Sequence, residues 1–384
     1  MGRIAHRFTL LFSLLLLGLL LKATDKKHSD SIYFYVGTYT DNQSEGIYLY
    51  SLNRSTGILT NHGLAAKSQN PSFLTMTKDQ RFLLAVNETN DESQQNMGVI
   101  ESFSIDALSR KLMPISKVLS GGAHPCFISV NQSGYVLAAN YTGGNFAMFK
   151  LSQSGKLTDF IDLQQHVGRG PNRVRQEKPH VHSAYFEPFT NRIFVADLGT
   201  DQIGVSILDE PKSKLLNPII STIAIKPGSG PRHIAFHSTL KLMYVVNELS
   251  NDVSVIALNK DNTFNTIETI STLPQENRTT SNCADIHLSN DNKFLYASNR
   301  GFNSIAIFAV DQTTGRLALI GQGMTHGETP RNFSLSPDND FLVVANQNSQ
   351  DIVSFRRNST TGKLEFSDKI KAFKPVCILF PNKE

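Results

Sequence analysis

The chain has 384 residues, of which 40% are hydrophobic and 18% charged, so it can bury a core and is neither a disordered nor a collagen-like protein. The formal net charge is +4, but Arg3, Arg7 and Lys22 lie in the first 23 residues, which hold no acid, and this leaves 4 − 3 = +1 for the rest. A near-neutral chain without a basic, aromatic-rich run is not expected to bind nucleic acid.

The amino terminus has the pattern of a signal peptide. Arg3 and Arg7 precede an unbroken apolar run from Phe8 to Leu21, which is shorter than the roughly 20 residues that a membrane-spanning helix needs. We interpret residues 1–23 as an export signal and residues 24–30 as a polar linker. The predicted protein is periplasmic or extracellular, and it would contact a membrane only through the leader, if the leader is not cleaved.

Two sequence units recur from residue 31 onward. Short runs rich in Val, Ile, Phe and Tyr, bounded by Gly, Asn, Asp or Pro, are typical of β-strands. The copies of the first unit are NPSFLTM, HPCFISV, HVHSAYF, GPRHIAF, NCADIHL, TPRNFSL and KPVCILF. A second unit, ending in Asn or Asp, follows six of them, and an additional copy, YFYVGT, stands at the start.

The two ends of the chain carry complementary half repeats. KPVCILF has no second unit after it, and YFYVGT has no first unit before it. Because a ring of blades leaves raw sheet edges unless the termini share a blade, this offset predicts that the two strands pair. We therefore predict an all-β fold, a seven-bladed β-propeller of four-stranded antiparallel blades over residues 31–384. A linear β-solenoid is the alternative, but it would not explain the half repeats.

Ionisable residues collect in the units that are expected to lie nearest the propeller axis. Those of the first unit include His180, His182, Arg232, His233, Asp285 and Arg331, and those that directly follow the Asn or Asp of a second unit include Glu88, Glu248 and Arg300. Uncompensated buried charge is costly, so these residues either pair across a water-filled channel or form a functional site. Arginine presents a planar fork of donors, which favours an anion-binding pocket with an acid–base group.

A metal site is a second hypothesis for the two histidines. His180 and His182 are separated by one residue, and residues at i and i+2 of a strand share a face. Zinc would need a third ligand, which Asp285 or Glu248 could supply, but the spacing does not require one. The three cysteines have neither disulfide nor metal-ligand spacing and are expected to be buried thiols. We expect no metal and no other cofactor.

Several segments resemble the seven-bladed lactonase family, which includes the propeller-type bacterial 6-phosphogluconolactonases and the fungal carboxymuconate cyclase. The resemblance runs from VGTYT at residues 36–40 to the carboxy terminus, and its most specific pieces are GPRH, NEL, CADIH and SNR. It implies a site with Arg232 from GPRH, Glu248 from NEL and Arg300 from SNR. The family histidine falls in KPHVHSAYF, where His182 aligns best and His180 is its close neighbour.

The resemblance implies hydrolysis of a small-molecule sugar lactone, as in a 6-phosphogluconolactonase. We expect Glu248 or His182 to act as the general base that activates water, and Arg232 to stabilise the oxyanion. The expected substrate-binding residues are Arg300, Arg331, His180 and Asp285. Phosphogluconolactone belongs to a cytoplasmic pathway, so the export signal argues for a different lactone.

Two alternatives from other functional classes stay open on the sequence alone. One is a cycloisomerase of the carboxymuconate type, which makes or breaks the same ester bond. The other is a non-catalytic exported propeller that binds a sugar acid, a glycan or a protein.

Overall fold

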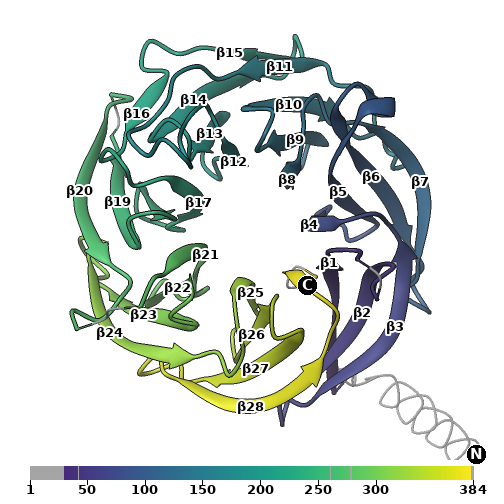
Figure 1. Ribbon diagram of the computed structural model, residues 1–384, viewed down its shortest axis with the longest axis vertical. Helices are drawn as coiled ribbons and strands as arrows, with labels where there is room; N and C mark the ends of the chain where they lie inside the picture. Colours follow the sequence, from purple (N-terminus) through teal and green to yellow (C-terminus); the bar gives the residue numbers. More distant parts are fainter. Residues whose placement is uncertain (1–29, 42, 260, 277–278, 382–384) are drawn as a thin grey trace, which may run out of the picture.

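The computed structural model describes residues 30–41, 43–259, 261–276 and 279–381, and in these ranges the chain forms seven antiparallel sheets arranged as a ring (Figure 1). The prediction of a seven-bladed propeller is confirmed. The predicted signal peptide, residues 1–23, lies outside the described residues, as does the linker up to residue 29. Within the described ranges, no helix is long and apolar enough to cross a membrane.

The strands follow one another in chain order around the ring. The first two blades contain β1 (Ser31–Thr38), β2 (Gly46–Asn53) and β3 (Leu59–Lys67), then β4 (Pro71–Met76), β5 (Phe82–Asp91), β6 (Met97–Ile105) and β7 (Leu112–Leu119), with the 3₁₀ helix η1 (Glu92–Gln94) after β5. The next two contain β8 (Pro125–Val130), β9 (Tyr135–Asn140), β10 (Asn145–Lys150) and β11 (Asp162–Gln165), then β12 (Val181–Phe186), β13 (Arg192–Asp197), β14 (Gln202–Asp209), β15 (Lys214–Leu216) and β16 (Thr222–Ala224).

The last three blades follow the same order. The fifth and sixth contain β17 (Pro231–Phe236), β18 (Leu242–Asn247), β19 (Asp252–Leu258) and β20 (Phe264–Ser271), then β21 (Asn282–Leu288), β22 (Phe294–Arg300), β23 (Ser304–Val310) and β24 (Leu317–Met324). The seventh contains β25 (Pro330–Leu335), β26 (Phe341–Asn346), β27 (Asp351–Arg357) and β28 (Leu364–Lys371), and β29 (Pro375–Leu379) ends the chain's strands. The first sequence unit forms the innermost strand of each blade, as expected (Figure 1).

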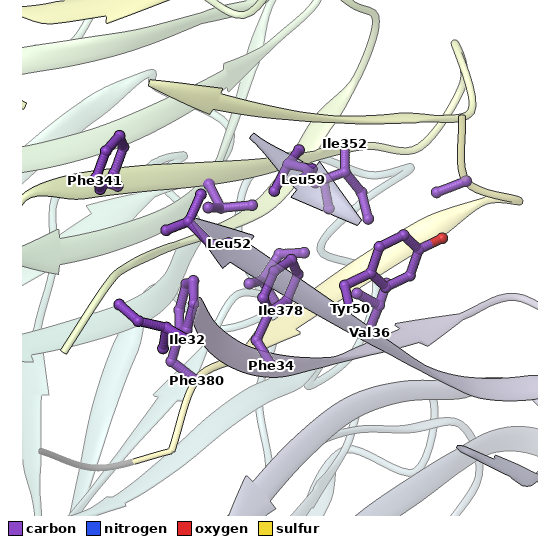
Figure 2. Close-up of a cluster of buried hydrophobic side chains, with 13 residues drawn as sticks. Ile32, Phe34, Val36, Tyr50, Leu52, Leu59, Phe341, Ile352, Ile378 and Phe380 are labelled. Carbon is purple, nitrogen blue, oxygen red and sulfur yellow. The ribbon is translucent and has the colours of Figure 1, made fainter. Parts of the chain in front are cut away.

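The ring closes where the two ends of the chain meet. β29 pairs antiparallel with β1, with Val36 opposite Ile378, so that the first blade has the order β29-β1-β2-β3. Around this joint, apolar side chains of the first and last blades form one buried cluster, in which Phe34 packs against Phe380 (Figure 2). The predicted pairing of the terminal strands is therefore confirmed, and it completes the first blade with a strand from the other end of the chain.

In each innermost strand the register shifts at one place, the third residue of the first sequence unit. In β17, Pro231 pairs with Asn247 and His233 with Val246, so Arg232 is an extra residue that has no partner across the ladder. The residues at the other irregularities are Ser72, Cys126, His182, Ala284 with Asp285, Arg331 and Val376. Such a β-bulge breaks strand alternation and re-aims a side chain.

The bulges correct one premise of the sequence interpretation. His180 and His182 were expected to share a strand face, but β12 begins at Val181 and its register shifts between Val181 and Ser183. His180 therefore precedes the strand, whereas His182 is the bulged residue. Regular alternation does not relate the two side chains.

The joint between the termini gives a stability prediction. Replacing Phe34, which is fully buried and packs against Tyr50 and Phe380, with alanine is expected to cost about 3–5 kcal/mol, because it leaves a cavity where the ring closes. The matched control is Phe366→Ala, since Phe366 is 47% exposed and its loss should change stability by about 0.5 kcal/mol or less. Thermal unfolding of both variants measures the difference, and equal melting temperatures would contradict the role of this cluster.

Candidate active site

Glu248 lies at the centre of a cluster of arginines at one end of the innermost strands. It follows β18 directly and is 3% exposed. Its Oε2 accepts from Arg232 Nε at 3.0 Å, and its Oε1 accepts from Arg175 Nη2 at 2.5 Å. Arg300 Nη2 forms an ion pair with Oε2 at 2.8 Å and donates its hydrogen bond to Cys283 O. Burial alone would raise the pKa of Glu248, but the three guanidinium groups outweigh it and lower the pKa to about 2. Glu248 is therefore a carboxylate at neutral pH.

Arg175 is a member of this cluster that the sequence interpretation missed. It lies in the segment between β11 and β12, outside both repeat units. The segment is fixed by Gln176, which is fully buried and donates to Leu198 O at 2.9 Å and to Asp201 Oδ1 at 2.8 Å. A signal was present, because the interval from Asn140 to Asp197, 197 − 140 = 57 residues, is the longest between second units and marks an insertion.

Arg232 is buried, and two of its three guanidinium nitrogens have hydrogen-bond partners among the described residues. Besides Glu248, it binds Ala284 O at 2.5 Å and His233 Nε2 at 3.3 Å, both through Nη1. Its Nη2 has no hydrogen-bond partner among the described residues. Burial and the nearby charge of Arg300 lower the pKa of Arg232 to about 10, so the group keeps its positive charge at neutral pH.

His182 lies beside Arg232 on the neighbouring innermost strand. Its Nδ1 is 3.6 Å from Cys126 Sγ, and its ring lies edge-on to those of Tyr141 and His233, at 5.5 and 5.3 Å between centroids. No described residue hydrogen-bonds to its Nε2. Burial, followed by the charges of neighbouring groups such as Arg232, lowers the pKa of His182 well below 6.5. His182 is therefore neutral at physiological pH and can accept a proton.

Arg331 faces the same cluster from the seventh blade. Its Nη2 lies 3.7 Å from Glu88 Oε2, and its guanidinium is 5.4 Å from the centroid of the Tyr39 ring. The Tyr39 hydroxyl donates to Glu88 Oε2 at 2.9 Å. The charge of Arg331 is one of the smaller causes that lower the pKa of His182, after burial and the charges of Arg232 and His233. The cluster thus contains four arginines and two glutamates, a local charge of 4 − 2 = +2.

His180 and Asp285, both expected to bind substrate, are already occupied by protein groups. His180 Nδ1 is 3.2 Å from Tyr141 O, its Nε2 is 3.1 Å from Glu177 Oε1, and its ring stacks on that of Tyr141 at 4.4 Å. Asp285 is 3% exposed and accepts from His233 Nδ1 at 2.7 Å. Both side chains are thus engaged by groups of the protein itself. Among the described residues, no group of three His, Cys, Asp or Glu is arranged to hold a metal ion.

The cysteines match their predicted role, since Cys126, Cys283 and Cys377 are buried free thiols. A separate hollow of about 1010 Å³ lies at the opposite ends of the inner strands, where Met76, Phe186 and Glu187 line it. The Glu187 carboxylate there is bound by Arg192 through two contacts of 2.8 and 2.9 Å. The combination of a neutral histidine and a guanidinium nitrogen without a described partner is found in the arginine cluster.

Comparison with known proteins agrees with this architecture. The family model described as a seven-bladed β-propeller lactonase matches residues 33–380. A 6-phosphogluconolactonase of Bacillus subtilis is 37% identical over 301 residues, which cover 78% of this chain and 83% of that protein. A 6-phosphogluconolactonase of Formosa agariphila is 37% identical over 307 residues, covering 78% of this chain and 85% of that protein.

A solved structure shows the same fold at useful sequence identity. The periplasmic gluconolactonase of Pseudomonas aeruginosa superposes with a TM-score of 0.86 at 30% identity, and the match covers 92% of this chain and 100% of that one. Fold, repeat number and sequence similarity over nearly the whole described chain thus lead to one assignment. The chain belongs to the seven-bladed β-propeller lactonase family.

Proposed function

We propose that the protein hydrolyses the lactone of a sugar acid to the open-chain acid at the arginine cluster. Family membership and the relatives named as lactonases support this activity. The observation that carries the proposal is the neutral His182, whose Nε2 is unbonded by described residues, beside the open Nη2 of Arg232. Together they provide a base for water and a cation for the oxyanion, which are the two requirements of ester hydrolysis.

In the proposed reaction, His182 Nε2 takes a proton from water as the water oxygen attacks the lactone carbonyl carbon. The carbonyl oxygen becomes an oxyanion, which Arg232 Nη2 stabilises. Collapse of this intermediate breaks the bond between the carbonyl carbon and the ring oxygen, and the leaving oxygen receives the proton from His182. The product is a hydroxy acid, which loses its own proton to become a carboxylate.

Of the two bases considered from the sequence, the geometry favours His182 over Glu248. Both oxygens of Glu248 are bound by guanidinium groups, whereas His182 Nε2 has no hydrogen-bond partner among the described residues. We assign Glu248 the role of holding Arg232, Arg300 and Arg175 in one orientation. In this role the negative charge of Glu248 orients the arginines, and His182 carries out the proton transfer.

The local charge of +2 suits a substrate with an anionic substituent, a carboxylate or a phosphate. Such an anion near Arg331 would offset one of the charges that depress the pKa of His182 and so make the base stronger once substrate is bound. The proposed export signal and the periplasmic relative favour an unphosphorylated sugar lactone. The family resemblance favours the 6-phosphate.

The test is the rate of hydrolysis of glucono-1,5-lactone and of its 6-phosphate by purified protein lacking residues 1–23, each corrected for spontaneous opening. Turnover of either substrate above the spontaneous rate supports the proposal, and the ratio of the two kcat/KM values identifies the substrate class. Rates equal to the spontaneous ones for both substrates would contradict it. Loss of carboxymuconate absorbance in a parallel ultraviolet assay would then support the cycloisomerase.

Arg175, in the segment between β11 and β12, gives a testable prediction. Arg175→Ala removes the only hydrogen-bond partner of Glu248 Oε1 among the described residues and one of four local cations, so we expect kcat/KM to fall roughly tenfold, mainly through a higher KM. Arg173→Ala is the matched control, because Arg173 is exposed on the same loop. Steady-state kinetics of both variants test this, and equal kcat/KM values would show that Arg175 contributes nothing.

A further inference from the structure

Beneath the arginine cluster, Arg232 rests on a buried histidine. Arg232 Nη1 lies 3.3 Å from His233 Nε2, and His233 Nδ1 lies 2.7 Å from Asp285 Oδ1. A guanidinium can only donate, so His233 Nε2 must accept and its Nδ1 must carry the proton that is donated to Asp285. His233 therefore bridges the arginine and the carboxylate as a neutral imidazole of one defined tautomer.

Asp285 connects this bridge to the rest of the ring. Its Oδ2 accepts from Asn332 Nδ2 at 2.5 Å and from His287 Nε2 at 3.0 Å. Asn332 Oδ1 in turn accepts from Ile378 N at 2.6 Å. The hydrogen bonds thus run around the axis from β17 through β21 and β25 to β29, the strand that closes the ring.

The surroundings leave His233 little freedom. It is 2% exposed, and the rings of Phe73 and Phe127 lie edge-on to it at 5.7 and 5.4 Å. Arg232 is held by three partners. Its Nε binds Glu248, and its Nη1 binds both Ala284 O and His233. The guanidinium group is planar, so the hydrogen bonds at Nε and Nη1 also fix the position of its third nitrogen, Nη2.

We propose that His233 and Asp285 are positioning residues, which hold the Arg232 guanidinium so that Nη2 meets the oxyanion of the reaction. This inference rests on the proposed lactone hydrolysis. Neither residue touches the substrate, and both act through Arg232. Because the oxyanion exists only after water has attacked, losing this alignment lowers kcat and leaves KM nearly unchanged.

The test compares two histidines that bind the same carboxylate. His233→Phe removes the contact with Arg232 and suits the aromatic surroundings, and we expect kcat to fall roughly tenfold or more while KM changes less than about twofold. His287→Phe removes the other imidazole from Asp285 without touching Arg232, and its kcat should stay within about twofold of the wild type. His233→Gln, whose amide has both an acceptor and a donor, should recover part of the lost kcat.

Each outcome decides the proposal. If His233→Phe and His287→Phe lower kcat equally, in step with their melting temperatures, the network is structural only and the proposal is overturned. If the wild-type protein has no lactone turnover, the proposed function fails, and the crystal structure of His233→Phe then tests the positioning by itself. The inference requires that Arg232 Nη1 leaves Ala284 O in that variant, and an unmoved guanidinium overturns it.

Discussion

Replacing Arg232 with methionine is expected to lower kcat for lactone hydrolysis by about 100- to 1000-fold, the loss that follows when one donor to an oxyanion is removed. Arg232 Nη2 is the proposed donor on the innermost strand beside His182, and methionine keeps an unbranched, shorter side chain without its hydrogen bonds. Glu248 keeps Arg300 and Arg175 as partners, so the substitution does not leave a buried carboxylate unpaired. The variant should therefore fold.

The control is another buried arginine at the far end of a strand. Arg357 is 5% exposed and binds Tyr296 Oη at 3.0 Å, Asn339 O at 3.1 Å and the exposed Asp291 at 3.2 Å. Arg357→Met should reduce the melting temperature at least as much as Arg232→Met and leave kcat close to the wild-type value. Measuring kcat and thermal unfolding for both separates catalysis from stability. A kcat that falls equally in the two variants would remove Arg232 from the proposed chemistry.

The fold was predictable because its signals are local and repeated. Seven copies of the inner-strand unit and the half repeats at the ends required a closed ring, and the pairing of β29 with β1 confirms it. The divided outer strand of the fourth blade was not predicted. β15 ends at Leu216 and β16 begins at Thr222, and Pro218 between them has no N–H to donate to a ladder.

The site was predictable only where it departs from the repeat. Arg232, Glu248 and Arg300 were found because they replace other residues at aligned positions, and the structure brings them together. Arg175 was missed because an insertion has no repeat against which a departure can be recognised. That His180 and Asp285 are already bonded could not be read from the sequence, since their partners come from other segments of the chain.

Replacing His182 with glutamine is expected to lower kcat by roughly 100- to 10,000-fold, the usual contribution of a general base. Glutamine preserves a polar side chain at the bulge of β12 but cannot take a proton from water. Arg232 keeps all its described partners in this variant, so substrate binding and KM should change little. Retention of wild-type kcat by His182→Gln would contradict the assignment.

The pH dependence distinguishes the two proposed bases. A general base acts in its deprotonated form. Because the pKa of His182 is lowered, kcat/KM should be constant around neutral pH and fall only in acid, with a midpoint below pH 6.5. We call this fall at low pH the acid limb of the pH profile. Glu248→Gln should disorder the three arginines and reduce the rate, yet retain this acid limb, because the proton acceptor is still present. His182→Gln should lose the limb together with the rate. If Glu248→Gln instead abolishes the limb and His182→Gln preserves it, the base is Glu248 and the roles of the two residues are exchanged.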